Sequence, residues 1–479
     1  MPLLILAVFC EQRGVDVPYG PVERAAFDHE AGANARGYPW LRHSTEAHGH
    51  RLTGSPQGAR AEAFADSLFR RCGLDHVERM PFTAELWSRG ELRVALVDGA
   101  DERPVPAVAL ANTPLRADLH APLVDAGNGL QADLDALGGR VAGAVAVMNL
   151  RLVDAPEGAR NLHRSMKVAL ARERGAVGVV FVNQVPGGVL LTGTASTDGG
   201  LTDIPAVCIG AEDGAALRAE LAAGRPVAAR IAMRNQWGAV QAHNVIAEIR
   251  GSRLPEDVIV VGAHQDSWDQ ATGAVDNGIG AFTVRDKARA MAAMPFRPER
   301  TVRFVLFMGE EQGLLGSRAL VRHYRRSGEL DRVRCMINLD MTGAPHGFGV
   351  TGPDGWGAWV GDLCATMRQE NSTRFRGSTT EAAWLHSDHQ PFLLAGVPVI
   401  YPLSDLGTAA YAGYHSDHDH IHLVDPYAMV ENVRTVGRMV YALAAARDLP
   451  PPFTPEELRA RLVDAGLETE LRVAGDWPW

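Results

Sequence analysis

The chain has 479 residues, of which 46% are hydrophobic and 22% are charged, so its composition is that of an ordinary folded protein with room for more than one domain. The net charge of -10 argues against nucleic-acid binding, which usually requires a basic surface. Five cysteines, odd in number and without a CxxC pair, indicate neither a disulfide framework nor a thiolate zinc site.

The chain begins with a short apolar run, from Leu3 to Phe9, within MPLLILAVFC. This run is far too short to cross a bilayer, so we expect no transmembrane segment. No Lys or Arg precedes it, and the bulky Phe9 lies where a small residue usually precedes cleavage. A signal-peptide remnant, a simple N-terminal strand and a wrongly assigned start are all compatible with it.

The next elements are a helical segment and then a module rich in short strands. Ser55 is suited to cap a helix with apolar residues at helical spacing, and Gly73 is suited to end it. From about residue 84 to residue 235, short β-type runs with glycine turns surround one helical pattern, RSMKVALARERGA. This arrangement predicts a compact α/β module inserted into another domain.

A second α/β domain follows the insert. Its apolar runs are continuous rather than alternating, as in buried parallel strands: DVIVVGA, TVRFVLFMG, RCMINLDM and VPVIYPL. Helical patterns lie between them. We therefore expect an α/β fold with a doubly wound, mostly parallel sheet and helices on both faces.

The last part of the chain predicts a surface helix without chemistry of its own. Thr454 and Glu457 can form a capping box around Pro455, and Gly466 is suited to end the helix. We accordingly divide the chain into a helical part over 1–83, the insert over 84–238, the second α/β domain over 239–449, and a C-terminal helix and tail over 450–479.

Side chains that can bind metal follow the predicted strands. His264 ends the first run, the Glu310–Glu311 pair follows the second, Asp340 follows the third, and His415 lies in a loop after the fourth. Because the carboxyl ends of parallel strands meet at one edge of a sheet, we expect these side chains to converge. Histidine and carboxylate ligands without cysteine suit zinc, and they also accommodate cobalt or manganese.

Asp276 is the best candidate to bridge two metal ions. It lies in the glycine-rich loop GAVDNGIG, which lets the backbone approach a bulky centre closely. A carboxylate can span two ions roughly 3.5 to 4 Å apart. Taken alone, this stretch could instead be a capped turn that starts a helix. Asp266 and Asp269 are both candidates to orient His264.

The pair Glu310–Glu311 predicts two roles, because neighbouring side chains of an extended chain point in different directions. One would bind metal, and the other would act as general base on a water molecule. Charge and spacing do not decide which, and two glutamates can also simply favour a helix N-terminus. The stretch YHSDHDHIH likewise offers four histidines, as ligands or as a solvated loop: His415, His418, His420 and His422.

Together these segments resemble a known family. GAHQDSWDQATGAVDNGIG, FMGEEQGLLGS, NLDMTG, HSDHQPF and GYHSDHD are similar to motifs of the co-catalytic di-zinc aminopeptidase and glutamate carboxypeptidase family, especially of its plasma glutamate carboxypeptidase branch. KVALARERGAVGVVFVNQ and DIPAVCIG resemble a protease-associated domain. The resemblance implies a zinc-peptidase fold into which a protease-associated domain is inserted.

The resemblance also implies roles for single residues. It makes His264 and Asp340 ligands of one zinc ion, Glu311 and His415 ligands of the other, and Asp276 the bridge. Glu310 becomes the general base, Asp266 the partner of His264, and Tyr414 a donor to the tetrahedral oxyanion.

The implied function is hydrolysis of the terminal peptide bond of small peptides or dipeptides, with aminopeptidase or dipeptidase polarity. The alternatives are a single-zinc glutaminyl cyclase, which the insert and the full set of ligands disfavour, and a non-catalytic receptor-like relative, which the retained ligands disfavour. No motif shows whether a substrate's ammonium or carboxylate is bound, since the basic segment RALVRHYRR predicts a solvated helix end. The resemblance further suggests a homodimer and an extracytoplasmic enzyme, whether secreted, periplasmic or lipid-anchored, with a cytoplasmic location as the alternative.

Overall fold

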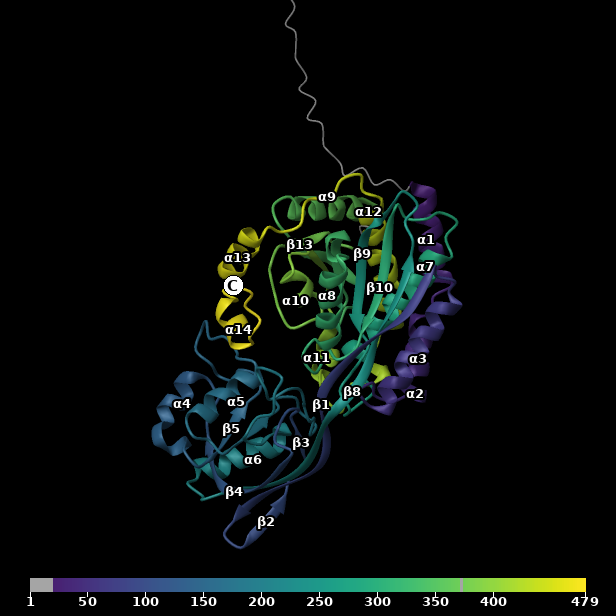
Figure 1. The fold of residues 1–479 in the computed structure, drawn as a ribbon. Helices are drawn as coiled ribbons and strands as arrows, with labels where there is room; N and C mark the ends of the chain where they lie inside the picture. Colours follow the sequence, from purple (N-terminus) through teal and green to yellow (C-terminus); the bar gives the residue numbers. More distant parts are fainter. Residues whose placement is uncertain (1–19, 371–373) are drawn as a thin grey trace, which may run out of the picture.

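The computed structural model describes residues 20–370 and 374–479. The apolar run from Leu3 to Phe9 lies outside these described residues. The described chain forms two α/β regions, a larger one and an inserted one, which share a single sheet of 14 strands (Figure 1).

The larger region is built on the continuous apolar runs of the sequence. Strands β9 (Leu254–His264), β10 (Arg300–Phe307), β11 (Val333–Asn338) and β14 (Val399–Ser404) are parallel neighbours in the order β10-β9-β11-β14. Every side chain of β10, and every one of β9 from Val258 onward, is buried, which is why these runs do not alternate. Strand β12 (Pro345–Thr351) pairs antiparallel with β14, and β13 (Ser378–Thr380) forms the edge. The predicted doubly wound, mostly parallel sheet is confirmed.

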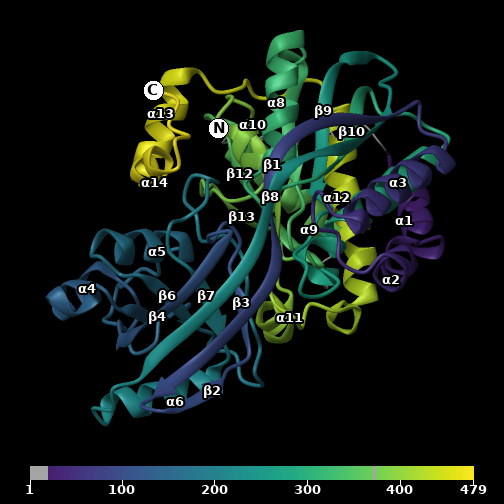
Figure 2. The same cartoon turned by 60° about the horizontal axis from the view of Figure 1, so that its bottom comes forward.

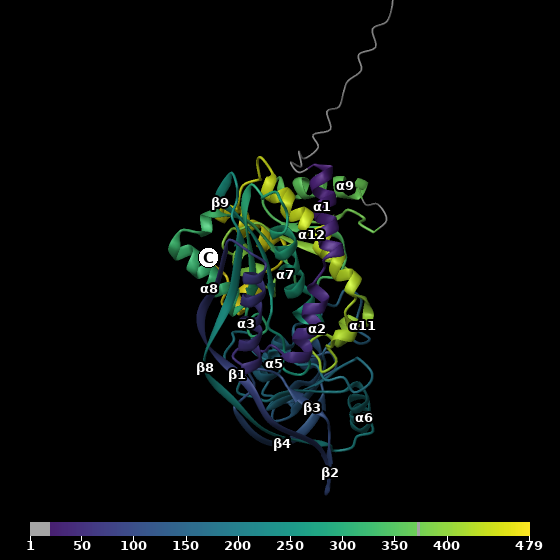
Figure 3. The same ribbon diagram turned by 90° about the vertical axis from the view of Figure 1, so that its right-hand side faces the viewer.

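Helices cover both faces of this sheet (Figure 3). Neighbouring residues of one strand belong to different cores: Val261 packs with the helices of one face and Val260 with those of the other. The first face carries α1 (Pro21–Ala33), α2 (Gly37–Ala47), α3 (Pro56–Arg71), α7 (Ile279–Ala292), α9 (Trp356–Glu370) and α12 (Pro426–Ala445). The second face carries α8 (Leu315–Ser327) and α10 (His389–Leu393).

Two long antiparallel strands, β1 (His76–Asp98) and β8 (Ala228–Ile249), run from the larger region into the insert (Figure 2). Strand β8 pairs with β10 at one end and with β4 (Arg116–Asp125) at the other, so the sheet continues through both regions. The insert adds β2 (Asp101–Pro104), β3 (Ala107–Ala109), β5 (Val145–Asn149), β6 (Gly178–Val182) and β7 (Ala206–Ile209), with helices α4 (Gln131–Leu137), α5 (Arg164–Glu173) and α6 (Ala211–Ala222). Strands β4 to β7 are parallel neighbours, as expected of an α/β module.

The last segment of the described chain forms two helices beside the larger region (Figure 1). Helix α13 (Pro455–Asp464) starts at the predicted capping box: the Glu457 N–H donates to Thr454 Oγ1 at 3.3 Å, and the Thr454 N–H donates to Glu457 Oε2 at 2.9 Å. Helix α14 (Glu468–Val473) follows it. The remaining elements are α11 (Gly407–Gly413), a π turn (Ala274–Gly278) and 3-10 turns at Gly138–Val141, Leu330–Arg332 and Ile421–Leu423. Across residues 20–370 and 374–479, none of the helices has both the length and the apolar character that a membrane span requires.

Candidate metal centre

The strand ends bring the predicted side chains to one edge of the sheet. His264 is the last residue of β9, the Glu310–Glu311 pair follows β10, and Asp340 follows β11. Strands β10 and β11 are the parallel neighbours of β9, so their ends flank His264. His415 arrives from the loop after α11, and Asp276 from the π turn before α7.

Asp276 lies between two histidines. Its Oδ1 is 3.3 Å from Nε2 of His264, and its Oδ2 is 3.0 Å from Nε2 of His415. Asp340 Oδ1 is also 3.3 Å from His264 Nε2, and Glu311 Oε2 is 2.8 Å from His415 Nε2. Asp276 is therefore shared by a His264–Asp340 group and a His415–Glu311 group.

The centre is buried and strongly acidic. Only 4% of Asp276 and 6% of Glu311 is exposed to solvent. Burial raises the pKa of Glu311 to about 7, although His415 opposes the shift, and burial also raises the pKa of Glu310 well above its usual value. Burial disfavours the charged rings of His264 and His415, but the surrounding carboxylates outweigh it and raise the pKa of both. Carboxylates gathered in this way need a compensating positive charge.

The donor set fits a divalent cation. The ligand atoms of His264, Asp276 and Glu311 all lie within 4.8 Å of one another, as do those of His264, Glu310 and Asp340. Among the described residues, Glu311 Oε1 is buried and has no hydrogen-bond partner. A buried carboxylate oxygen without a hydrogen-bond partner, inside a cluster of histidine and carboxylate groups, is suited to bind a metal ion.

Glu310 lies at the edge of the centre. Its Oε2 is 3.9 Å from His264 Nε2, and its side chain lines a cavity that lies over the metal-binding residues. Glu311, the next residue, points instead to His415. The two glutamates thus face different parts of the centre, although they lie in a bend and turn after β10 and not in the extended segment that the sequence suggested.

Asp266 holds both glutamates through their backbone. Its Oδ1 accepts from the Glu310 N–H at 3.3 Å and its Oδ2 from the Glu311 N–H at 3.4 Å. Asp266 Oδ1 is also 3.5 Å from His264 Nδ1. Asp269 is turned away and pairs with Arg89 at 2.9 Å. The structure therefore separates the two aspartates that spacing alone left open.

Tyr414 stacks on His415, with ring centroids 3.8 Å apart, and it lines the same cavity. Burial raises the pKa of Tyr414 far above its usual range, so its hydroxyl stays protonated. A protonated hydroxyl beside the His415–Glu311 group can donate a hydrogen bond to a developing oxyanion.

The cavity over the centre has a volume of about 840 Å³. Residues of the insert form part of its lining, including Arg164 at the start of α5. Arg164 Nη2 is 3.2 Å from Nδ1 of His415, and Arg164 Nε is buried without a hydrogen-bond partner among the residues that the structure describes. Arg318, from the predicted basic helix end, also lines the cavity, but Asp476 binds its guanidinium.

Three supporting residues were missed by sequence reasoning. Asp419 accepts hydrogen bonds from the backbone N–H groups of Val275 and Asp276, at 2.7 and 2.9 Å. Arg51 donates to the carbonyls of residues 265, 272 and 273, and Ser387 Oγ donates to Asp340 Oδ2 at 2.7 Å. Asp419 lies within YHSDHDHIH, where the histidines are the more conspicuous side chains.

The other histidines of that stretch do not join the centre. In the part of the chain that the structure describes, no ion pair joins His418, His420 or His422 to a carboxylate of the centre, whereas His415 pairs with both Asp276 and Glu311. His420 and His422 have ring centroids 6.3 Å apart, and His418 is exposed. Of the four histidines, the structure brings His415 to the sheet edge.

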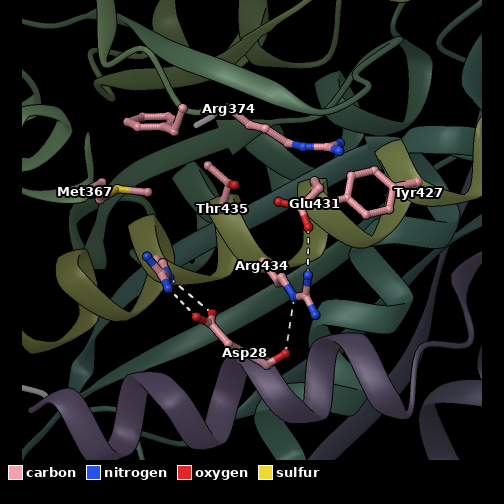
Figure 4. Close-up of a pocket in the computed structure, with 9 residues that line it drawn as sticks. Asp28, Met367, Arg374, Tyr427, Glu431, Arg434 and Thr435 are labelled. Carbon is pink, nitrogen blue, oxygen red and sulfur yellow. Dashed lines mark hydrogen bonds and ion pairs between the residues drawn. The ribbon is translucent and has the colours of Figure 1, made fainter. Parts of the chain in front are cut away.

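A second cavity, of about 340 Å³, lies between α1 and α12 (Figure 4). Its carboxylates already have cationic partners: Asp28 pairs with Arg438, and Glu431 Oε1 accepts from Arg434 at 2.7 Å. Arg434 also donates to the Asp28 carbonyl at 3.2 Å. This network fastens α1 to α12, and the metal-binding groups found among the described residues lie elsewhere.

Comparison with known proteins agrees with this fold. Over 417 residues the chain is 26% identical to carboxypeptidase Q of Xenopus laevis, a match that covers 83% of each chain. The match to the bovine protein of that name spans 54% of its length. Among solved structures, the chain is similar to a peptidase M28 precursor from Shewanella amazonensis, with 25% identity, a TM-score of 0.77 and coverage of 90% of this chain and 99% of that one. It is also similar to an aminopeptidase from Aneurinibacillus sp. strain AM-1, with 25% identity, a TM-score of 0.64 and coverage of 90% and 98%.

Two family profiles divide the chain in the way that the structure does. Residues 119–217, within the insert, match the PA domain, and residues 244–440, within the larger region, match peptidase family M28. The predicted resemblance is thereby confirmed for both parts: the larger region carries the match to peptidase family M28, and the insert carries the match to the PA domain.

Proposed function

We propose that the protein is a zinc-dependent exopeptidase that hydrolyses the terminal peptide bond of small peptides, with dipeptides as the preferred class. The observation that carries this proposal is that two histidine–carboxylate groups share Asp276 on the floor of one cavity, with Glu310 beside them. The names of similar proteins support it, because one relative is called a carboxypeptidase and one structural neighbour an aminopeptidase.

The centre would hold two zinc ions, and the same donors also suit cobalt or manganese. His264 and Asp340 would bind one ion, Glu311 and His415 the other, and Asp276 would bridge them. When bound, such a pair supplies Lewis-acid polarisation of the substrate carbonyl and lowers the pKa of water towards ~7.

The protein's own groups would move the proton and stabilise the developing charge. Glu310 Oε2 takes the proton of the attacking water and delivers it to the leaving nitrogen. Asp266 keeps Glu310 in place by accepting from its backbone N–H. The Tyr414 hydroxyl donates to the oxyanion of the tetrahedral intermediate.

Arg164 supports a preference for substrates with a free carboxylate. If Nε2 of His415 gives its lone pair to a metal ion, Nδ1 of the same ring carries the hydrogen and cannot accept from Arg164. The guanidinium then lacks a partner at Nη2 as well as at Nε, in a cavity that also contains the substrate. A peptide carboxylate is the substrate group that satisfies such donors best.

The first test concerns the base and the metal together. Glu310→Gln removes the proton acceptor but keeps the size of the side chain, so we expect kcat to fall by about 10²- to 10⁴-fold while zinc stays bound. Metal analysis should give two zinc ions per chain for the native protein and for the variant. A Glu310→Gln protein that remains fully active would refute the assignment of the base.

The second test concerns the terminus that is recognised. We expect amidation of a dipeptide's carboxylate to lower kcat/KM by about tenfold or more, because a charge-assisted hydrogen bond is lost. Arg164→Met should lower kcat/KM for the free dipeptide and not for the amide. Arg172→Met is the matched control, since Arg172 lies on the same helix and pairs with Asp203 on the surface. If only blocking of the amino group mattered, Arg164 would have no role in binding, although the exopeptidase proposal would stand.

The homodimer and the extracytoplasmic location remain predictions of the resemblance. Sedimentation analysis of the purified protein tests the first, and fractionation of the producing cells tests the second.

A further inference from the structure

The segment from Glu470 to Asp476 lies along the same cavity as the metal centre. Glu470, Leu471, Ala474 and Asp476 all line it, together with Glu310, Asp340 and His415. This segment lies beyond residues 244–440, which match the peptidase family. A part of the chain outside the family match therefore forms one wall of the substrate cavity.

Asp476 anchors this wall to the larger region. Its carboxylate accepts from both Nη atoms of Arg318, at 2.5 Å each, and from Nε2 of Gln390 at 2.9 Å. Arg318 and Gln390 themselves line the cavity. A bidentate pair of this kind fixes both the position and the orientation of the backbone that carries it.

A second anchor joins the wall to the insert. Glu470 Oε1 is 2.6 Å from Nε2 of His386, and the His386 ring stacks on His163 of the insert, with centroids 5.7 Å apart and an angle of 14° between the planes. In Figure 1, α14 accordingly lies close to α5 of the insert. Three parts of the chain meet at this side of the cavity.

Apolar packing makes the wall a fixed element. Leu458, Leu462 and Leu471 of α13 and α14 are at most 3% exposed and belong to one core with Phe392 and Leu393 of α10. Burial of a leucine side chain stabilises a fold because it removes apolar surface from water. The wall itself contains Leu471, and detaching it together with α13 would expose all three leucines, so it does not act as a mobile lid.

We propose that the segment from Glu470 to Asp476 is a specificity wall that limits the length of the peptides that the enzyme accepts. This inference rests on the proposed function, because it concerns the substrate of the same site. The cavity of about 840 Å³ falls within the range typical of small-molecule sites, and the wall forms its lining on the side of α14. A longer peptide bound at the metal centre would meet this wall.

Filling the wall tests the proposal. Ala474→Trp places a large side chain on the cavity lining, whereas Val473→Trp places the same group at a neighbouring position that is 44% exposed and outside the lining. We expect Ala474→Trp to lower kcat/KM for a tripeptide by about tenfold or more relative to a dipeptide, and Val473→Trp to leave this ratio unchanged. Equal ratios in the two variants would overturn the proposal.

Loosening the wall gives an independent result if Ala474→Trp fails to fold. Asp476→Asn weakens the pair with Arg318 without changing the size of the side chain. The buried Leu471 still holds α14, but the end of the wall from Ala474 to Asp476 should loosen, so the ratio of pentapeptide to dipeptide kcat/KM should rise severalfold. An unchanged ratio would contradict the proposal that this segment limits peptide length, although the protein would still be a peptidase. A native, zinc-loaded protein that turns over no peptide at all would instead refute the proposed function.

Discussion

At the scale of single residues, the position of Asp276 depends on Asp419. Asp419 accepts from two successive backbone N–H groups, those of Val275 and Asp276, and it is only 3% exposed. Both oxygens of Asp276 must face different histidines at the same time, so a small rotation of this backbone would misalign one of them. The carboxylate of Asp419 prevents that rotation without touching either histidine's Nε2.

Asp419→Asn should weaken zinc binding. An asparagine can accept from one of the two N–H groups, but its own NH₂ would face the other donor. Loss of such a supporting contact usually lowers metal affinity by about 10- to 100-fold, and competition with a chelator measures it. Asp417→Asn is the matched control, because Asp417 lies in the same loop as Asp419 but accepts from the N–H of Leu190 in the insert. Equal zinc affinities in the two variants would contradict this role.

The sequence could predict which side chains converge, because the apolar runs identify parallel strands and parallel strands end at one edge. It could not predict Asp419. The hydrogen bonds of Asp419 join positions 143 residues apart, and they depend on how two loops meet above the sheet. Likewise, the sequence could not show that Asp269 pairs with Arg89 and so differs from Asp266. That pair forms because β1, which carries Arg89, passes beside the loop of Asp269.

At the scale of elements, local sequence patterns predicted the buried strands and the start of α13, but not the pairing of β1 with β8 or the surface on which α13 packs. The runs that form β9, β10, β11 and β14 were predicted because burial on both faces makes them continuously apolar. The long pairing of β1 with β8 was not predicted, because its two strands are separated by the whole insert. The capping box located the start of α13, but a cap contains no information about the surface on which the helix packs.

Thr454→Ala should destabilise the start of α13 by about 1 kcal/mol, because the Glu457 N–H loses its acceptor. Amide exchange in the first turn of α13 should become several-fold faster, and hydrogen-exchange mass spectrometry of peptides covering residues 454–464 measures this. Thr469→Ala serves as control, since Thr469 is exposed and lies within α14 rather than at a cap. Unchanged exchange in Thr454→Ala would show that the box contributes nothing.

At the scale of the whole molecule, metal removal should make stability depend on pH with a defined sign. In the metal-free fold the pKa of Glu311 is about 7, above its ordinary 4.5, and those of His264 and His415 lie above their ordinary 6.5. The folded state therefore holds protons that the unfolded state releases, so the free energy of unfolding falls as pH rises through this range.

Thermal unfolding of chelator-treated protein between about pH 6.5 and about pH 8 checks this, and the melting temperature should decrease towards the higher pH. Burial lowers the pKa of His163 and His389, and these two histidines oppose the trend below this window. Zinc-loaded protein is the control, because its ligands are already deprotonated and zinc affinity increases with pH. The difference between the two melting temperatures should widen as pH rises. A metal-free protein that becomes more stable over the same range would show that these groups do not hold their protons in the folded state.

The single sheet of both regions has a consequence for the entropy of substrate binding. Strand β8 is hydrogen-bonded to β10 in the larger region and to β4 in the insert, so no flexible linker lies between the two. The cavity between them keeps its width before a substrate arrives, and binding does not have to order a hinge. Because ordering of loops and domains reduces affinity, we expect rapid association in a single kinetic phase, without a slow closing step.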